Sequence, residues 1–156
     1  MDYTNHPPCF PMAYARIVGD PLAPELCGIV RFFQTPCGVW VEADVHNLPP
    51  NPTGFYGFHI HEFGDCSMGS RDGYFKAAGG HYNPTNQLHP LHAGDLPMLI
   101  ATSTGNARLN FLTDRFTVND IVGRAVIIHY DYDNYTSQPS GDSGARIGCG
   151  IITTME

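Results

Sequence analysis

The stretch GFHIHEFGDC, residues 57–66, places His59 and His61 two positions apart within an apolar run. Side chains alternate between the two faces of a β-strand, so residues i and i+2 share one face. Both imidazoles are therefore expected on one side of the strand, with Ile60 on the other. Two neutral imidazoles on one face can bind a single metal ion, because histidine is the commonest nitrogen ligand for transition metals. The alternative is a pair of polar side chains on the solvated face of an edge strand, and the short motif does not decide between them.

Eight short segments with alternating or β-branched apolar residues predict β-strands, and no segment has a convincing amphipathic helical pattern. Several of the gaps between them carry turn-forming sequences, such as LPPNPTG and STGN. This organisation predicts an all-β fold, an antiparallel sandwich or barrel. The predicted strands are residues 13–19, 27–33, 39–46, 55–61, 98–104, 107–112, 121–129 and 148–153.

Two gaps, residues 62–97 and 130–147, are far too long for hairpin turns. Long loops without secondary structure are uncommon in a compact domain and are usually functional or disordered. Both contain chemically interesting residues, so we expect them to carry the function.

Length and composition predict one domain over residues 13–156 after a tail at residues 1–12. The net charge is −7, and Lys76 is the single lysine, so no basic stripe is present to bind nucleic acid. No apolar run approaches the ~18 residues of a membrane helix. The N-terminal residues do not resemble a secretory signal. The sequence therefore predicts a cytoplasmic protein if Met1 is the native start, and an extracytoplasmic one if the chain has been trimmed.

The five cysteines form no CxxC motif, and their odd number leaves at least one free thiol. A cytoplasmic location would argue against any disulfide. We expect Cys27 and Cys37 to be buried small residues or free thiols, and Cys9 belongs to the tail.

The first long loop contains GGHYNPTNQLHPLHAGDLP, with three histidines and an aspartate within fifteen residues. Three nitrogen ligands and one oxygen ligand suit tetrahedral Zn²⁺. A bound ion would also offset the entropy cost of ordering so long a loop. The alternative is a polar loop with scattered histidines. The four candidate ligands are His81, His89, His92 and Asp95.

His129 ends the apolar run GRAVIIH, where the second long loop begins. A single histidine at the end of a strand is more often a core or rim residue than a ligand. With His59 and His61 it becomes a candidate third ligand for one ion.

The segments GFHIHEFGDCS, GGHYNP, LHAGDLP, GRAVIIH and GARIGCG resemble those of the copper/zinc superoxide dismutases, in the same order. The resemblance runs from about residue 13 to residue 152. The compact second loop and the position of Cys66 are more similar to the bacterial branch than to the animal branch. The resemblance implies an eight-stranded Greek-key barrel with two long functional loops that hold a copper and a zinc between them.

The resemblance also implies a reaction, the disproportionation of superoxide to O₂ and H₂O₂. His81 would bridge the two ions through its two ring nitrogens and pass a proton to the substrate during turnover. Related dismutases pair through different faces, so the resemblance allows a homodimer without indicating its interface. The implied ligands are His59, His61, His81 and His129 for copper, and His81, His89, His92 and Asp95 for zinc.

Three further roles follow from the resemblance. Asp133 matches the aspartate that orients one copper and one zinc histidine, although it could equally be a turn residue. Arg146 matches the arginine that attracts the anion beside copper, and such an arginine can also tie the loop to backbone carbonyls. Cys66 and Cys149 match a disulfide that joins the first long loop to the last strand.

Attraction of the superoxide anion is the point at which this sequence departs from the animal branch. The animal enzymes place lysines in the second long loop, whereas this chain has Asp131, Asp133 and Asp142 there. Either Lys76 or Arg71 supplies the positive field from the other loop, or electrostatic steering is weak.

Two other functions would use some of the same residues. A copper- or zinc-binding module without catalysis would share the ligands but would not need Arg146. A cupin-type oxygenase would also use a His-x-His motif followed by a glutamate. In this chain, however, Glu62 directly follows His61, where the cupin pattern needs several residues between them.

Overall fold

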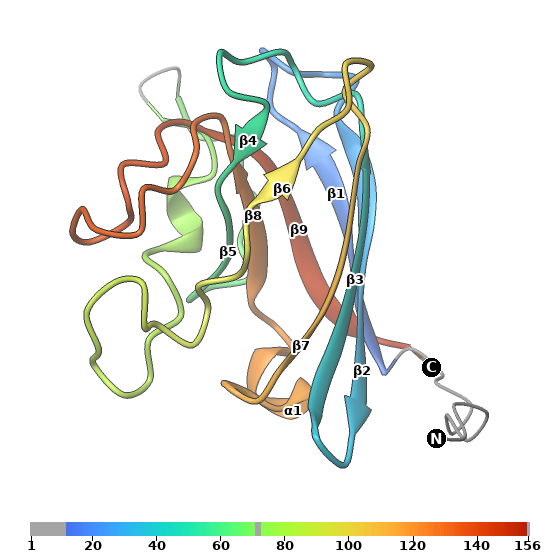
Figure 1. Cartoon of the computed structure of the whole chain (residues 1–156), viewed down its shortest axis with the longest axis vertical. Helices are drawn as coiled ribbons and strands as arrows, with labels where there is room; N and C mark the ends of the chain where they lie inside the picture. The colour runs from blue at the N-terminus through green and yellow to red at the C-terminus, as the bar shows by residue number, and fades with distance from the viewer. Residues whose placement is uncertain (1–11, 71–72, 156) are drawn as a thin grey trace.

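The protein is described by a computed structural model that covers residues 12–70 and 73–155. Nine strands of the described chain form a seven-stranded sheet and a two-stranded sheet (Figure 1). Residues 1–11 of the predicted tail, and Arg71, lie outside the described residues. The elements are β1 Ala13–Gly19, β2 Cys27–Thr35, β3 Gly38–His46, β4 Phe55–Tyr56, β5 Phe58–His61, η1 Lys76–Ala78, β6 Leu99–Ile100, β7 Ala107–Thr113, α1 Val118–Ile121, β8 Ala125–His129 and β9 Arg146–Thr154.

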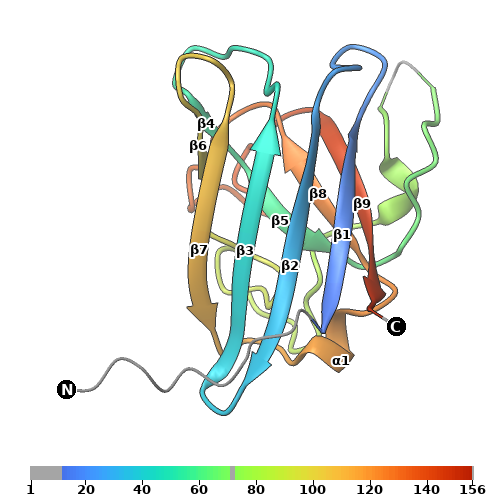
Figure 2. The same ribbon diagram turned by 90° about the vertical axis from the view of Figure 1, so that its right-hand side faces the viewer.

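The large sheet has the strand order β5-β8-β9-β1-β2-β3-β7, and all neighbouring strands are antiparallel. Strands far apart in sequence are paired, β5 with β8 and β3 with β7, as in Greek-key folds. The large sheet curls, and β4 and β6 lie behind β7 in the view of Figure 2 (Figures 1 and 2). The predicted all-β antiparallel fold is confirmed. No helix of the described residues is long and apolar enough to cross a membrane.

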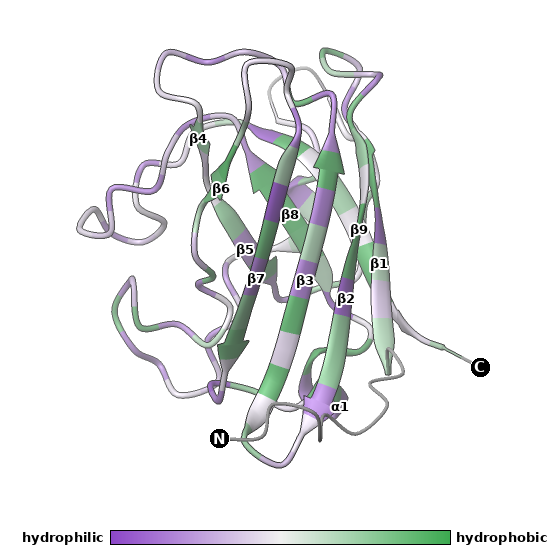
Figure 3. Ribbon diagram, turned by 45° about the vertical axis from the view of Figure 1, so that its right-hand side comes forward, coloured by the Kyte–Doolittle hydropathy of each residue, from purple (hydrophilic) through white to green (hydrophobic). Residues whose placement is uncertain are grey.

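The core follows from the period-two pattern of the strands. On β3, the side chains of Val39, Val41 and Val45 are fully buried, while Trp40 and Glu42 on the other face are half-exposed. Figure 3 shows the resulting alternation of apolar and polar bands along β3 and β7. The buried faces close over one main cluster, which includes Phe32, Phe58, Ile60 and Ile128.

The predicted strand at residues 55–61 is interrupted at Gly57, which separates β4 from β5. The Gly57 amide donates to the carbonyl of Asp131 at 2.8 Å, and its carbonyl accepts from the amide of His129 at 2.8 Å. A Cβ at this position would lie 2.8 Å from the Cβ of Ser143. The break therefore brings the second long loop close to the strand that carries the paired histidines.

Two other predicted strands are shorter than expected. The segment before β8 begins as the helical turn α1, because Thr117 and Asp120 form a reciprocal capping box. Of residues 98–104, only Leu99–Ile100 pair as a strand, since a turn closes where the Gly105 amide donates to the carbonyl of Thr102.

The first long loop returns along the free edge of β5 and covers it. The Ile60 amide donates to the carbonyl of Gly94, and the Tyr82 amide donates to the carbonyl of Ile60, both at 2.8 Å. Covering an edge strand satisfies backbone groups that would otherwise face solvent. Both long loops lie on the same side of the sheet, beside β5 and β8 (Figure 1). They therefore enclose the histidine face of β5.

Candidate metal centre

Four histidines from three segments meet beside the edge of the sheet. His59 and His61 come from β5, His129 ends β8, and His81 is paired to His61 by an isolated β-bridge. All four histidines are buried. One ring nitrogen from each lies within 4.8 Å of the chosen nitrogen of every other. The predicted placement of His59 and His61 on one face is confirmed, and His129 is not merely a rim residue.

Hydrogen bonds determine which nitrogen of each ring is free. Nδ1 of His61 donates to the carbonyl of Gly79 at 3.0 Å, and Nδ1 of His129 donates to the carbonyl of Gly144 at 3.3 Å. Their Nε2 atoms are left 3.3 Å apart. Among the described residues, Nδ1 of His59 and Nε2 of His81 are buried without a hydrogen-bond partner. Orphaned buried nitrogens are rare in folded proteins and fit a site built for an ion.

A second group gathers three histidines and one carboxylate from the first long loop. Nδ1 of His81 lies 2.7 Å from Oδ1 of Asp95, and Nδ1 of His89 lies 3.0 Å from Oδ2 of the same residue. Nδ1 of His92 lies 3.3 Å from Nδ1 of His81. Three nitrogens and one oxygen this close match the donor set of a tetrahedral zinc site. The structure thus assembles all four residues predicted for zinc.

His81 belongs to both groups. Its Nδ1 faces Asp95 and His92, and its unpaired Nε2 is on the side of the ring toward the first group. The ring centroid of His81 is 4.0 Å from that of His59 and 4.9 Å from that of His61. One imidazole therefore stands between two candidate ion sites.

Asp133, in the second long loop, connects the two groups from behind. Its Oδ2 accepts from Nε2 of His59 at 2.7 Å, and its Oδ1 accepts from Nε2 of His89 at 2.8 Å. Both hydrogen bonds leave the Nδ1 atoms of these histidines free for an ion. A carboxylate bonded to the remote nitrogen of a ligand fixes the orientation and tautomer of the ring. Gly141 permits this contact, because a Cβ there would lie 2.0 Å from Oδ1 of Asp133.

Burial keeps His59, His61 and His129 of the first group neutral. It lowers the pKa of His59 and His61 well below the ordinary value, with a further lowering from the neighbouring His129, and it lowers the pKa of His129 to about 3. Burial raises the pKa of the Asp95 carboxyl, but the hydrogen bond from His81 and the neighbouring histidines outweigh it, and the pKa ends below its ordinary value. Neutral imidazoles and an ionised carboxylate are the protonation states that bind metals.

We expect the metal-free protein to lose stability as the pH falls. Unfolded histidines take up protons below about pH 6.5, whereas His129 in the fold takes one up only near pH 3. The free energy of unfolding should therefore fall through this window, by up to about 1.4 kcal/mol per pH unit for each such histidine. Urea denaturation between pH 7 and pH 5 measures the slope. His129→Gln should reduce the slope; an equal slope in His129→Gln and in the unsubstituted protein would contradict this account.

Arg146 lies at the start of β9 and ties the first long loop to the sheet. Nη1 donates to the carbonyl of Phe75 at 2.8 Å, and Nη2 donates to the carbonyl of Gly79 at 2.6 Å. The Gly79 carbonyl also accepts from His61, so Arg146 is one residue removed from the first group. The arginine lines a pocket of about 280 Å³ together with Lys76. Arg146 and Lys76, two of the predicted sources of positive charge, thus lie close together.

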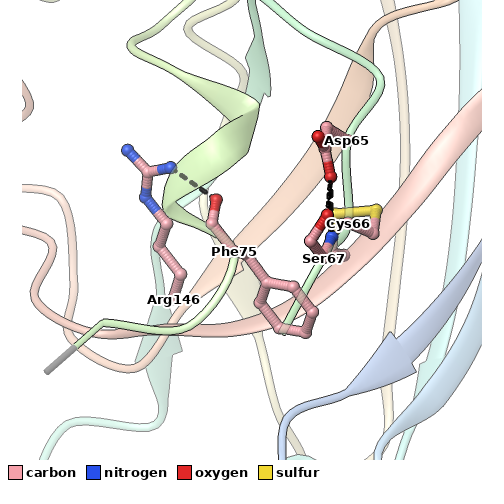
Figure 4. The surroundings of a disulfide bond; sticks show 6 residues. Asp65, Cys66, Ser67, Phe75 and Arg146 are labelled. Atoms are coloured by element: carbon pink, nitrogen blue, oxygen red, sulfur yellow. Dashed lines mark hydrogen bonds between the residues drawn. A yellow bond between two sulfur atoms is a disulfide. The ribbon is translucent and has the colours of Figure 1, made fainter. Parts of the chain in front are cut away.

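A disulfide between Cys66 and Cys149 joins the first long loop to β9, across 83 residues of sequence. Cys149 is fully buried against Phe75 and Ile127, and the bond lies beside the Arg146–Phe75 contact (Figure 4). The predicted pairing is confirmed. Cys27 and Cys37 are free and exposed, which confirms the alternative of free thiols and excludes that of buried small residues.

Comparison with known proteins identifies this arrangement. The family model of copper/zinc superoxide dismutase matches residues 26–152. This chain belongs to the copper/zinc superoxide dismutase family. The "Superoxide dismutase [Cu-Zn]" of Legionella pneumophila is 40% identical over 136 residues, which cover 83% of this chain and 79% of the relative. "Superoxide dismutase [Cu-Zn] 1" of Aquifex aeolicus is 37% identical over 142 residues, which cover 82% of this chain and 80% of the relative.

A solved dismutase structure agrees with the sequence matches. The copper/zinc superoxide dismutase from Brucella abortus superposes with a TM-score of 0.76 at 30% identity, and the match covers 89% of this chain and 98% of that chain. The family, the enzyme class and the two cofactors predicted for this dismutase are therefore confirmed. The ion bound by each individual residue stays a prediction.

Sequence reasoning missed two side chains that hold residues 89–95 of the first long loop. The side chains of Gln138 and Arg115 hydrogen bond to backbone groups of residues 89–95. Neither residue stands in a motif, and neither is near this segment in sequence. Only the folded arrangement shows them.

Proposed function

We propose that this chain disproportionates superoxide at a copper ion held by the first histidine group, beside a zinc ion held by the second. The observation that carries the proposal is the position of His81, which offers one nitrogen to each group. A metal buffer needs ligands but no shared imidazole. The proposed copper ligands are His59, His61, His81 and His129, and the proposed zinc ligands are His81, His89, His92 and Asp95.

Copper, when bound, supplies the alternating one-electron chemistry, since four imidazoles suit Cu(II) and fewer ligands suffice for Cu(I). The chain supplies the proton. Nε2 of His81 is the atom that can hold a proton for half of the cycle and donate it to the substrate as the peroxide product forms. Asp95 and His92 lie beside Nδ1 of the same ring and fix its orientation, so that Nε2 stays directed toward the first group.

Positive charge near the site attracts the substrate anion. Arg146 and Lys76 line one pocket, and we propose that they provide the local field that the overall charge of −7 opposes. The two hydrogen bonds from Arg146 to loop carbonyls fix the guanidinium in place. Arg146 thus combines both of the roles considered for it.

The decay of a superoxide pulse, expressed per bound copper, tests the proposal. The copper- and zinc-loaded protein should accelerate the decay strongly, and His61→Ala should lose at least about 100-fold of that activity because a ligand is removed. His46→Ala is the matched control, since His46 contacts Asn106 and Asp44 away from the site. Full activity in His61→Ala would refute the assigned copper site.

The disulfide supports an oxidising compartment, because such bonds persist there and are rare in reducing cytosol. We therefore propose the extracytoplasmic alternative for this chain. The small-molecule partner is superoxide. That the chain forms a homodimer stays a prediction.

A further inference from the structure

A side chain from the second long loop fixes the backbone of the first long loop at His89. Oε1 of Gln138 accepts from the backbone amide of His89 at 2.9 Å, and Nε2 of Gln138 donates to the backbone carbonyl of His89 at 2.7 Å. The amide side chain thus pairs with both backbone groups of one residue. The ring of His89 also hydrogen bonds to Asp133, as the ring of His59 does.

Arg115, between β7 and α1, holds the same segment from the barrel side. Its Nη1 lies within hydrogen-bond distance of the carbonyls of Pro90, His92 and Asp95, at 3.0, 3.3 and 3.4 Å. Gln138 and Arg115 therefore bind five backbone groups of residues 89–95. Three of the four proposed zinc ligands belong to this short segment.

We propose that Gln138 and Arg115 are positioning residues that hold residues 89–95 in the zinc-binding conformation before the ion arrives. This inference rests on the proposed zinc site. An unrestrained loop must lose backbone entropy when the ion binds, because each of its residues becomes fixed. Hydrogen bonds that already fix the loop reduce this cost and so increase zinc affinity.

The effect should be specific to zinc. The copper histidines are oriented by other groups, namely the carbonyls of Gly79 and Gly144 and the carboxylate of Asp133. Within the described chain, neither Gln138 nor Arg115 hydrogen bonds to His59, His61 or His129. A general loss of folding would weaken the binding of both ions. Loss of the hydrogen bonds from Gln138 and Arg115 should weaken the binding of zinc alone.

Competition with a chromophoric chelator measures Zn²⁺ affinity in the metal-free protein and its variants. Gln138→Ala removes both hydrogen bonds, and Gln138→Glu keeps the size but removes the donor to the His89 carbonyl. Arg115→Ala removes the second contact. Arg108→Ala is the matched control, because Arg108 is an exposed arginine on β7 whose side chain pairs with Asp44, away from residues 89–95.

The expected result is a Zn²⁺ dissociation constant raised about 10-fold in Gln138→Ala, Gln138→Glu and Arg115→Ala, and unchanged in Arg108→Ala. Cu²⁺ affinity, measured with the zinc site saturated, should be unchanged in all of them. Unchanged Zn²⁺ affinity in the first three variants, or an equal loss for both ions, would overturn the inference. A wild-type chain that binds no Zn²⁺ would overturn the proposed metal centre itself, and the inference with it.

Discussion

His81→Ala is expected to abolish dismutation, with a loss of at least about 100-fold in the rate per bound copper. The substitution removes the only imidazole that both groups share, and with it the Nε2 atom that we assign as proton donor. It also leaves Asp95 without its 2.7 Å hydrogen bond from Nδ1. The copper site would keep three histidines, so the protein should still bind copper.

His92→Ala separates the two roles of His81. This variant loses a proposed zinc ligand that lies 3.3 Å from Nδ1 of His81, but it keeps every nitrogen of the first histidine group. Its activity should fall less than that of His81→Ala, because Nε2 is still present although less firmly held. Superoxide decay after pulse generation measures both variants. Full activity in His81→Ala, or a greater loss in His92→Ala, would contradict the bridging role.

Cys66→Ser is expected to lower the free energy of unfolding by about 4 kcal/mol in oxidising buffer. The disulfide joins two cysteines 83 positions apart in sequence, and this cross-link restricts the unfolded chain. Cys66 is the better position to replace, because a hydroxyl at the fully buried Cys149 would add a separate burial cost. Urea denaturation of the metal-free protein measures the change.

Cys27→Ser is the control for that experiment. Cys27 is a free, exposed thiol on β2, so its replacement should leave the free energy of unfolding nearly unchanged. If Cys66→Ser were as stable as Cys27→Ser, the disulfide would not be a main source of stability. Loss of the disulfide should also loosen Arg146. The loop that Cys66 anchors carries the Phe75 and Gly79 carbonyls to which Arg146 donates.

Most of the histidines and the aspartate that form the two groups could be predicted to lie together because they follow short-range patterns. His59 and His61 share a face through the strand period, and the four zinc candidates lie within fifteen residues of one loop. Asp133 and Arg146 came from the family resemblance, since a single aspartate or arginine in a loop has no distinguishing local pattern. The structure then showed why Asp133 matters, as it bonds to His59 and His89 together.

The remaining features depend on tertiary contacts. Residues 55–61 have a continuous strand pattern, yet Gly57 breaks it because Ser143 and Asp131 approach from the second long loop. Likewise, Gln138 and Arg115 bind backbone groups, whose positions follow from the fold rather than from residue type. Patterns along the chain cannot show which distant carbonyl a side chain reaches.

The stoichiometry of products is the measurement that tests the central claim most directly. Disproportionation converts two superoxide anions and two protons into one O₂ and one H₂O₂, with no external reductant. The copper- and zinc-loaded protein should therefore accelerate superoxide decay and yield one H₂O₂ for every two superoxide anions consumed, with one O₂ evolved. One H₂O₂ per superoxide with no O₂, or tight copper binding without accelerated decay, would contradict the assignment of this centre as a dismutase site.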